Sequence, residues 1–201
     1  MSNALSSNYH LKQLAEDFDS LLNLKQQTDV TIKCGEKLFD CHQNILVSRS
    51  QVFKMMFESN MKEKITGSVE VEDMDPDVFE DLLKYIYSGE SPNIDLHLEE
   101  LFAAADQYQL EKLKELCELK LCLKLEVSNC IDLLILGDLH HATNLKTSAL
   151  KFVSKNITQI DSSEWEPKLV AYPTLMAQVF KMTLQKASDS TTEVKKRSAL
   201  T

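Results

Sequence analysis

Three short stretches of alternating apolar and polar residues, separated by helical patterns, constrain the fold more than any other feature. Residues 30–34 alternate, a turn follows at Gly35–Lys37, and residues 38–41 are the return strand of an expected β-hairpin. Residues 68–72 alternate again and predict a third strand added to this hairpin. Three short strands bury little apolar surface by themselves, so helices from the rest of the chain must pack on them.

Helices account for most of the chain, since only 4 Gly and 4 Pro occur among 201 residues and apolar residues recur three and four apart. Asp75 is placed as an N-cap, Pro76 as the first helical residue and Gly89 as the stop of one helix. The apolar phase slips at Tyr108–Gln109, which predicts two helices joined by a tight corner within residues 98–122. Further helices are expected at 10–25, 45–47, 50–57, 128–140, 143–157, 164–170 and 173–184. The fold class is therefore α+β and mainly helical: a small three-stranded sheet flanked by helices, followed by an all-helical C-terminal extension.

Bulk composition narrows the classes of partner. The formal net charge of −9 disfavours nucleic-acid binding, because neutralising phosphates requires a basic face. No apolar run approaches the roughly 18 residues that a membrane-spanning helix needs, so we expect no membrane contact. Five cysteines, an odd number without framework spacing, favour a reducing compartment, the nucleus or the cytosol.

The sequence offers little that resembles catalytic or metal-binding chemistry. His140 and His141 are adjacent, and neighbours on a helix point about 100° apart, so the two side chains cannot readily share an ion. Cys117 and Cys122 fit core cysteines better than zinc ligands. The Cys41–His42 pair has no evident third group to orient it as a nucleophilic dyad. We therefore expect no enzymatic activity, no metal and no cofactor.

Fixed spacings over about thirty residues resemble the signature of BTB/POZ domains. They are Thr28-Asp29-Val30, Phe39-x-x-His42-x-x-Ile45-Leu46 and Ser48-x-Ser50-x-Val52-Phe53-x-x-Met56-Phe57. Later segments are similar to the speckle-type POZ group in particular: Asp75–Phe79, Tyr85–Gly89, Leu101–Leu110 and Ile135–His140. The resemblance implies a BTB/POZ domain over residues 10–121 and a three-box and partial BACK helical region over 122–185. From Lys186 on, a Ser/Thr/Lys content without apolar periodicity predicts a disordered tail over 186–201. It also implies a dimeric adaptor core of a cullin-3 RING ubiquitin ligase, in the nucleus or the cytoplasm.

The resemblance also implies positions of contact. For the dimer interface these are Leu14, Phe18, Leu21 and Ile45. For the amino-terminal region of cullin-3 they are the hydrophobic-x-Glu motif Met61-x-Glu63, with further contacts from Phe57, Asn60, Tyr87 and Tyr108. Tyr87 and Tyr108 equally fit core rings with a satisfied hydroxyl. Phe180 matches an aromatic position that relatives use for a second self-association and higher oligomers, and it equally fits packing against Trp165 or Leu169.

An alternative stays open, namely a self-assembly or transcriptional co-repressor scaffold that binds no cullin, but one departure from the family pattern weakens its co-repressor form. Co-repressor BTB domains commonly pair an Asp with a basic residue directly after the signature His, whereas here Asp29 is accompanied by Gln43. The substrate-binding MATH domain that relatives carry is absent from these 201 residues. We therefore expect either a fragment of a longer protein or a short variant that associates with full-length MATH-BTB relatives.

Overall fold

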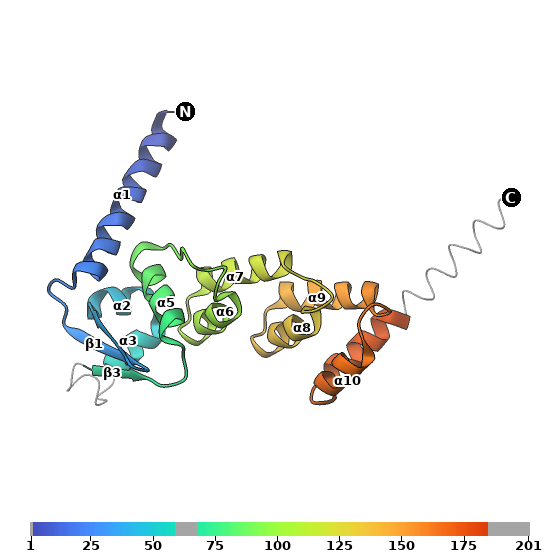
Figure 1. The fold of residues 1–201 in the computed structure, drawn as a ribbon. Helices are drawn as coiled ribbons and strands as arrows, with labels where there is room; N and C mark the ends of the chain where they lie inside the picture. The colour runs from blue at the N-terminus through green and yellow to red at the C-terminus, as the bar shows by residue number, and fades with distance from the viewer. Residues whose placement is uncertain (1, 59–67, 185–201) are drawn as a thin grey trace. The chain divides into compact units, whose positions relative to one another are not determined.

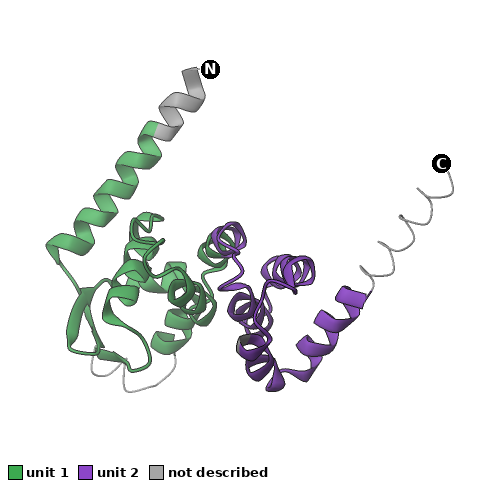
Figure 2. Ribbon diagram, turned by 45° about the vertical axis from the view of Figure 1, so that its right-hand side comes forward, with its two compact units in different colours: residues 1–117 green, residues 118–201 purple. Residues whose placement is uncertain are grey.

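A computed structural model describes residues 2–58 and 68–184 of the chain. The chain divides into two compact units, Met1–Cys117 and Glu118–Thr201, and the division falls inside one helix (Figure 2). The first unit contains a sheet with helices and the second is helical (Figure 1). This agrees with the α+β, mainly helical class expected from the sequence.

The first unit interleaves strands and helices. Its described elements are α1 (Ser2–Leu24), β1 (Val30–Cys34), β2 (Lys37–Cys41), α2 (Gln43–Arg49), α3 (Gln51–Glu58), β3 (Ser68–Val71), α5 (Pro76–Ser88), α6 (Leu98–Gln107) and the start of α7 (Glu111–Leu123). The helix pair α6 and α7 meets at a corner where Gln109 takes a left-handed conformation (φ 54°), as the slip of the apolar phase predicts.

The sheet has the order β2-β1-β3. β1 and β2 form the expected antiparallel hairpin, with Ile32 opposite Phe39. β3 runs parallel to β1 on its other side, with Ile32 opposite Val69. Alternation of burial along β1 and β3 turns Ile32, Cys34 and Val69 into the core, so one face of the sheet receives the helices.

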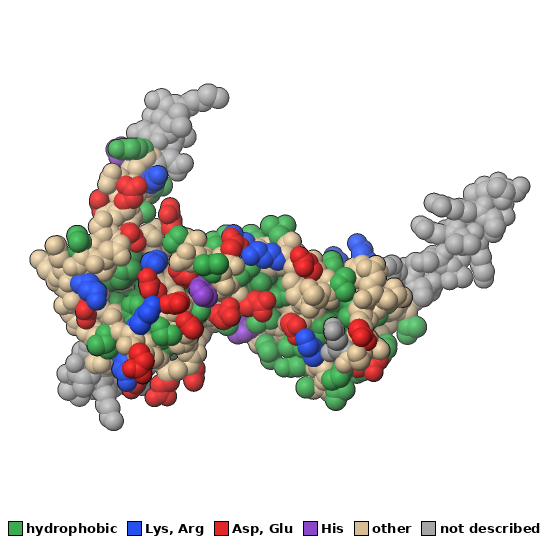
Figure 3. All heavy atoms as spheres, viewed as in Figure 1, with side chains coloured by type: hydrophobic (Ala, Val, Ile, Leu, Met, Phe, Trp, Pro, Cys, Tyr) green, Lys and Arg blue, Asp and Glu red, His purple; other side chains and the backbone are tan. Residues whose placement is uncertain are grey.

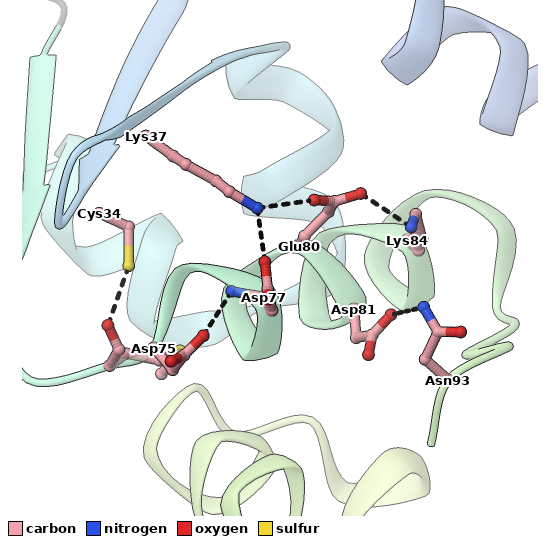
Figure 4. A network of polar contacts seen from close by, with 9 residues as sticks. Cys34, Lys37, Asp75, Asp77, Glu80, Asp81, Lys84 and Asn93 are labelled. Carbon is pink, nitrogen blue, oxygen red and sulfur yellow. Dashed lines mark hydrogen bonds and ion pairs between the residues drawn. The ribbon is translucent and has the colours of Figure 1, made fainter. Parts of the chain in front are cut away.

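Polar contacts fix α5 to the hairpin (Figure 4). Asp75 caps the helix by accepting from the Asp77 N–H at 2.7 Å, Pro76 follows, and Gly89 ends the helix at φ 78°. Lys37, at the start of β2, pairs with Asp77 and also with Glu80. These contacts tie the start of α5 to β2. The apolar face of α5 is buried in the core.

The second unit contains the rest of α7, α8 (Cys130–Leu139), α9 (Thr143–Asn156), α10 (Ser162–Val170) and helical residues 173–184. α8 and α9 pack closely against each other, and the backbone of Lys146 approaches Gly137. Trp165 is buried in a cluster with Leu134, Val153 and Leu169. The predicted tail lies outside the described residues.

Candidate protein-interaction site

Helix α1 presents more apolar surface than its own unit covers. It packs against α5, where Ala15, Phe18 and Leu22 are half-buried. Leu14 and Leu21 lie on the same broad stripe and remain 52% and 37% exposed. A helix that packs only against its own domain does not need so wide a stripe, so the uncovered edge of α1 suits a second protein surface.

A groove of about 380 Å³ runs beside this stripe. Its walls come from three elements: α1 contributes Leu11, Leu14, Ala15 and Phe18, α2 contributes Ile45, Ser48 and Arg49, and α5 with its last turn contributes Ile86, Tyr87, Ser88 and Gly89. The structure therefore brings three of the predicted dimer residues, Leu14, Phe18 and Ile45, to one groove. Leu21 lies on α1 but does not line it.

Arg49 is a groove residue that the sequence analysis missed. Its Nε donates to the carbonyl of Ile86 at 3.1 Å, and its guanidinium lies 5.6 Å from the ring centroid of Tyr85. The available signal was its position four residues after Ile45, because residues i and i+4 share one face of a helix. The groove thus joins an apolar lining to a fixed cation.

The predicted cullin-contact residues separate into two groups. Met61, Asn60 and Glu63 lie outside the described residues. The three aromatic residues are described and all are buried: Phe57, Tyr87 and Tyr108 are 3%, 6% and 2% exposed. These rings lie beneath the surface. For the two tyrosines, this matches the alternative in which they are rings of the core.

Tyr108 and Phe57 belong to one aromatic group. The ring centroid of Phe53 lies 4.9 Å from Tyr108 and 6.3 Å from Phe57. Burial raises the pKa of Tyr108 to about 12. The Ser50 hydroxyl donates to the Tyr108 carbonyl at 2.7 Å and accepts from the Phe53 N–H at 3.3 Å, the bond of an N-cap at the start of α3. The last turn of α3 is therefore anchored in the core.

The hydroxyl of Tyr87 contacts both the backbone and the ring of His42. It accepts from the His42 backbone N–H at 2.8 Å and lies 2.9 Å from His42 Nδ1, while His42 Nε2 lies 2.7 Å from the carbonyl of Gln26. Because a carbonyl can only accept, Nε2 carries the proton, and in the neutral ring Nδ1 accepts from Tyr87. Burial raises the pKa of the adjacent Cys41 to about 12, so the thiolate that a Cys41–His42 dyad would need is disfavoured.

Asp29 does not face a basic residue at the position after His42. Its Oδ1 instead accepts from the Gln43 backbone N–H at 2.7 Å and so satisfies the first turn of α2. The departure noted in the sequence thus has a structural counterpart, because the carboxylate of Asp29 serves as a helix cap.

In the second unit, Phe180 is half-exposed and contacts Trp165 edge to face, with ring centroids 6.1 Å apart. Phe180 therefore packs on Trp165, as one alternative for this residue required, and leaves half of its surface exposed.

Cys117 is fully buried and Cys122 half-buried. Within residues 2–58 and 68–184, no group of three or more His, Cys, Asp and Glu side chains is arranged to hold a metal ion.

Charge on the first unit is mixed: on the face in Figure 3, acidic and basic side chains lie interspersed. Among the described helices, none is both long enough and apolar enough to cross a bilayer.

A family model described as BTB/POZ domain matches residues 18–125, more than half of the chain. Among solved structures, the chain is similar to the BTB domain of zebrafish PATZ1, with 22% identity over 55% of this chain and 89% of that one and a TM-score of 0.47.

Proposed function

We propose, since the chain belongs to the BTB/POZ domain family, that it is a self-associating adaptor whose first unit pairs with a second copy and holds cullin-3 in a ubiquitin ligase. The observation that carries the proposal is the uncovered apolar edge of α1 beside the α2–α5 groove. The compartment we propose is the nucleus or the cytoplasm, in keeping with an odd number of cysteines that lack the spacing of a disulfide framework.

Self-association through α1 has a clear energetic basis. Fully burying a leucine side chain contributes about 1.5–3 kcal/mol, and Leu14 still exposes half of its surface. In an isologous dimer each such side chain is buried twice, once in each copy, so a few partly exposed residues suffice to favour the dimer. Conversely, a charge at Leu14 is desolvated twice and the dimer dissociates.

Cullin-3 binding is proposed from the Met61-x-Glu63 motif. The motif begins three residues after Glu58, the last residue of α3, and Phe57 anchors that last turn in the core. Methionine adapts to an irregular apolar pocket, and a rim carboxylate adds orientation more than affinity. We propose Met61 as the anchor, with Glu63 and Asn60 beside it, and we assign Phe57, Tyr87 and Tyr108 to supporting positions.

Two substitutions test the two contacts separately. Met61→Asp is expected to abolish capture of the cullin-3 amino-terminal region in a pull-down and to leave the dimer mass in light scattering unchanged. Met55→Asp is the matched control, because Met55 is an exposed methionine of α3 outside the motif. Equal cullin capture by wild type and Met61→Asp would overturn the role of Met61, and no capture by wild type would favour the cullin-free scaffold instead.

Leu14→Asp is expected to convert the dimer to a monomer while far-UV circular dichroism stays the same. Leu96→Asp makes the same change at an exposed leucine of the first unit that does not line the groove, and should remain dimeric. A wild type that is monomeric at micromolar concentration would refute self-association through this surface.

We further propose that the exposed half of Phe180 mediates a second self-association, and that full-length MATH-BTB relatives pair with this chain through α1. Leu184 is exposed one turn later on the same helix, which extends the apolar surface. Phe180→Asp should remove species larger than the dimer from sedimentation profiles, whereas Val170→Asp, at another exposed apolar position of this unit, should not. Unchanged larger species in Phe180→Asp would contradict the proposal.

A further inference from the structure

The loop between α1 and β1, residues 25–29, is tied to a single short segment of the chain, residues 40–43, at the junction of β2 and α2. The contacts are Lys25 Nζ to Asp40 Oδ2 at 3.4 Å, His42 Nε2 to the Gln26 carbonyl at 2.7 Å, the Asp29 N–H to the Cys41 carbonyl at 3.1 Å, and the Gln43 N–H to Asp29 Oδ1 at 2.7 Å. The backbone that joins α1 to β1 is therefore fixed at this junction.

The loop depends on these contacts because its backbone is strained. Lys25 and Gln27 adopt left-handed conformations, with φ of 49° and 56°. Residues with a side chain rarely adopt this conformation, and it persists only where surrounding contacts hold it. Without the contacts to residues 40–43, the loop would relax, and only the packing on α5 would hold the direction of α1.

His42 connects this loop to the floor of the groove. Its Nε2–H donates to Gln26, and its Nδ1 and backbone N–H both meet the hydroxyl of Tyr87, which lies in the last turn of α5 and lines the groove. α1 packs on the same α5. His42 is thus a brace between the exit of α1 and the helix against which α1 lies.

We infer that His42 is a positioning residue for self-association, which fixes the direction of α1 through the carbonyl of Gln26 and so presents Leu14 and Phe18 to the second copy. The inference rests on the proposed self-association. A helix free to turn at its exit must be ordered when the dimer forms, and that ordering weakens the dimer. Because both copies carry the brace, its loss is felt twice.

A pair of substitutions separates this role from plain packing. The amide nitrogen of a glutamine can occupy the place of histidine Nε2, whereas that of an asparagine matches Nδ1 and falls short of Gln26. Both variants lose the imidazole ring. His42→Asn is expected to raise the dimer dissociation constant about tenfold or more relative to His42→Gln, the change that one net hydrogen bond supports.

The dissociation constants are measured by sedimentation over a dilution series, together with hydrogen exchange of the amides of residues 25–29, which should be faster in His42→Asn alone. His141→Asn makes the same substitution at an exposed histidine of the second unit and should match wild type. Equal dissociation constants for His42→Asn and His42→Gln would overturn the inference.

If His42→Asn does not fold, Gln27→Val decides, since a β-branched residue disfavours the left-handed backbone of the same loop and Gln27 is exposed, so the core is untouched. It should weaken the dimer while circular dichroism is retained, and an unchanged dimer would overturn the inference. A wild type that is monomeric sinks both proposals. If Leu14→Asp breaks the wild-type dimer but the His42 and Gln27 variants do not weaken it, self-association stands and only the positioning role of His42 is refuted.

Discussion

Replacing Gly137 with alanine should destabilise the second unit, although alanine is the better helix former. Gly137 lies inside α8, where this substitution ordinarily stabilises a protein by about 1 kcal/mol. Here a Cβ would lie 2.8 Å from the backbone nitrogen of Lys146, 3.2 Å from its Cα and 3.3 Å from Leu145 Cγ. The first of these distances is shorter than side chains tolerate, so α8 and α9 would have to separate.

The start of α9 cannot shift without losing other contacts. The Lys146 N–H donates to the Ala142 carbonyl at 2.9 Å, the Leu145 N–H donates to Glu118 at 2.9 Å, and Lys146 Nζ pairs with Asp138 at 2.6 Å. Overpacking costs about 1–3 kcal/mol, and a strained or lost hydrogen bond adds roughly 1 kcal/mol. Set against the propensity gain of about 1 kcal/mol, the net loss is about 1–3 kcal/mol.

The assay uses the single tryptophan of the chain, because Trp165 is buried in the second unit. Urea unfolding followed by its fluorescence should show a lower midpoint in Gly137→Ala. Gly89→Ala is the control: its φ is 78° but no atom lies within 4 Å of the added Cβ, so it should cost about 1–2 kcal/mol in the first unit. A higher Trp165 midpoint in Gly137→Ala would refute the close approach of the two helices.

Other substitutions probe the hydrogen bonds, burial and surface charge of the two units. Ser50→Ala leaves the Tyr108 carbonyl and the Phe53 N–H without their buried partner and should lower the free energy of unfolding by about 1–3 kcal/mol, measured by circular dichroism in urea. The buried Cys41 thiol, with its pKa raised to about 12 from an ordinary 9, stabilises the fold fully below pH 9 and loses this contribution as the pH rises toward 12, at up to about 1.4 kcal/mol per pH unit. Cys41→Ala should therefore flatten the decline in stability between about pH 9 and pH 11 in reducing buffer, and an equal slope in both proteins would contradict this. Lys168→Gln removes an exposed ion pair with Asp132 and should change the free energy of unfolding, followed by Trp165 fluorescence in urea, by less than about 1 kcal/mol, an effect that vanishes in high salt.

The sequence predicted those elements whose signals are local. Asp75, Pro76 and Gly89 mark the two ends of α5 because capping, a missing N–H and a left-handed stop each act within one turn. The corner at Tyr108–Gln109 was visible because two apolar faces of different phase cannot belong to one straight helix. These predictions depend on no contact between distant residues.

Element ends and strand neighbours were harder to predict. α1 begins at Ser2, not near residue 10, because the polar residues before His10 carry no apolar periodicity from which a helix can be predicted. Alternation located β3 but gave no partner strand: it shows which face is buried, not which edge is paired, and β3 lies parallel to β1 on the edge away from β2. α10 likewise begins at Ser162, two residues before the expected start, where Asp161 caps it.

The candidate site was predictable in part. Leu14, Phe18 and Ile45 were expected at one interface and the structure places them around one groove. The burial of Tyr87 could not be predicted, because a tyrosine has one apolar body and one polar tip and fits either a core or a surface. Its position follows from His42, forty-five residues away in the chain, whose ring and backbone both meet its hydroxyl.

The helix pair α2 and α3 contributes to both proposed contacts. Ile45 and Arg49 of α2 line the self-association groove, whereas Phe57 of α3 anchors the turn that precedes the Met61 motif. Ser50 joins the two helices and ties them to Tyr108. A change at Ser50 should therefore weaken both contacts together through the shared support, whereas changes at exposed positions on either side, Leu14 and Met55, should act on no more than one. Loss of both activities in a surface variant thus indicates unfolding, and loss of one with the dimer intact indicates a true contact.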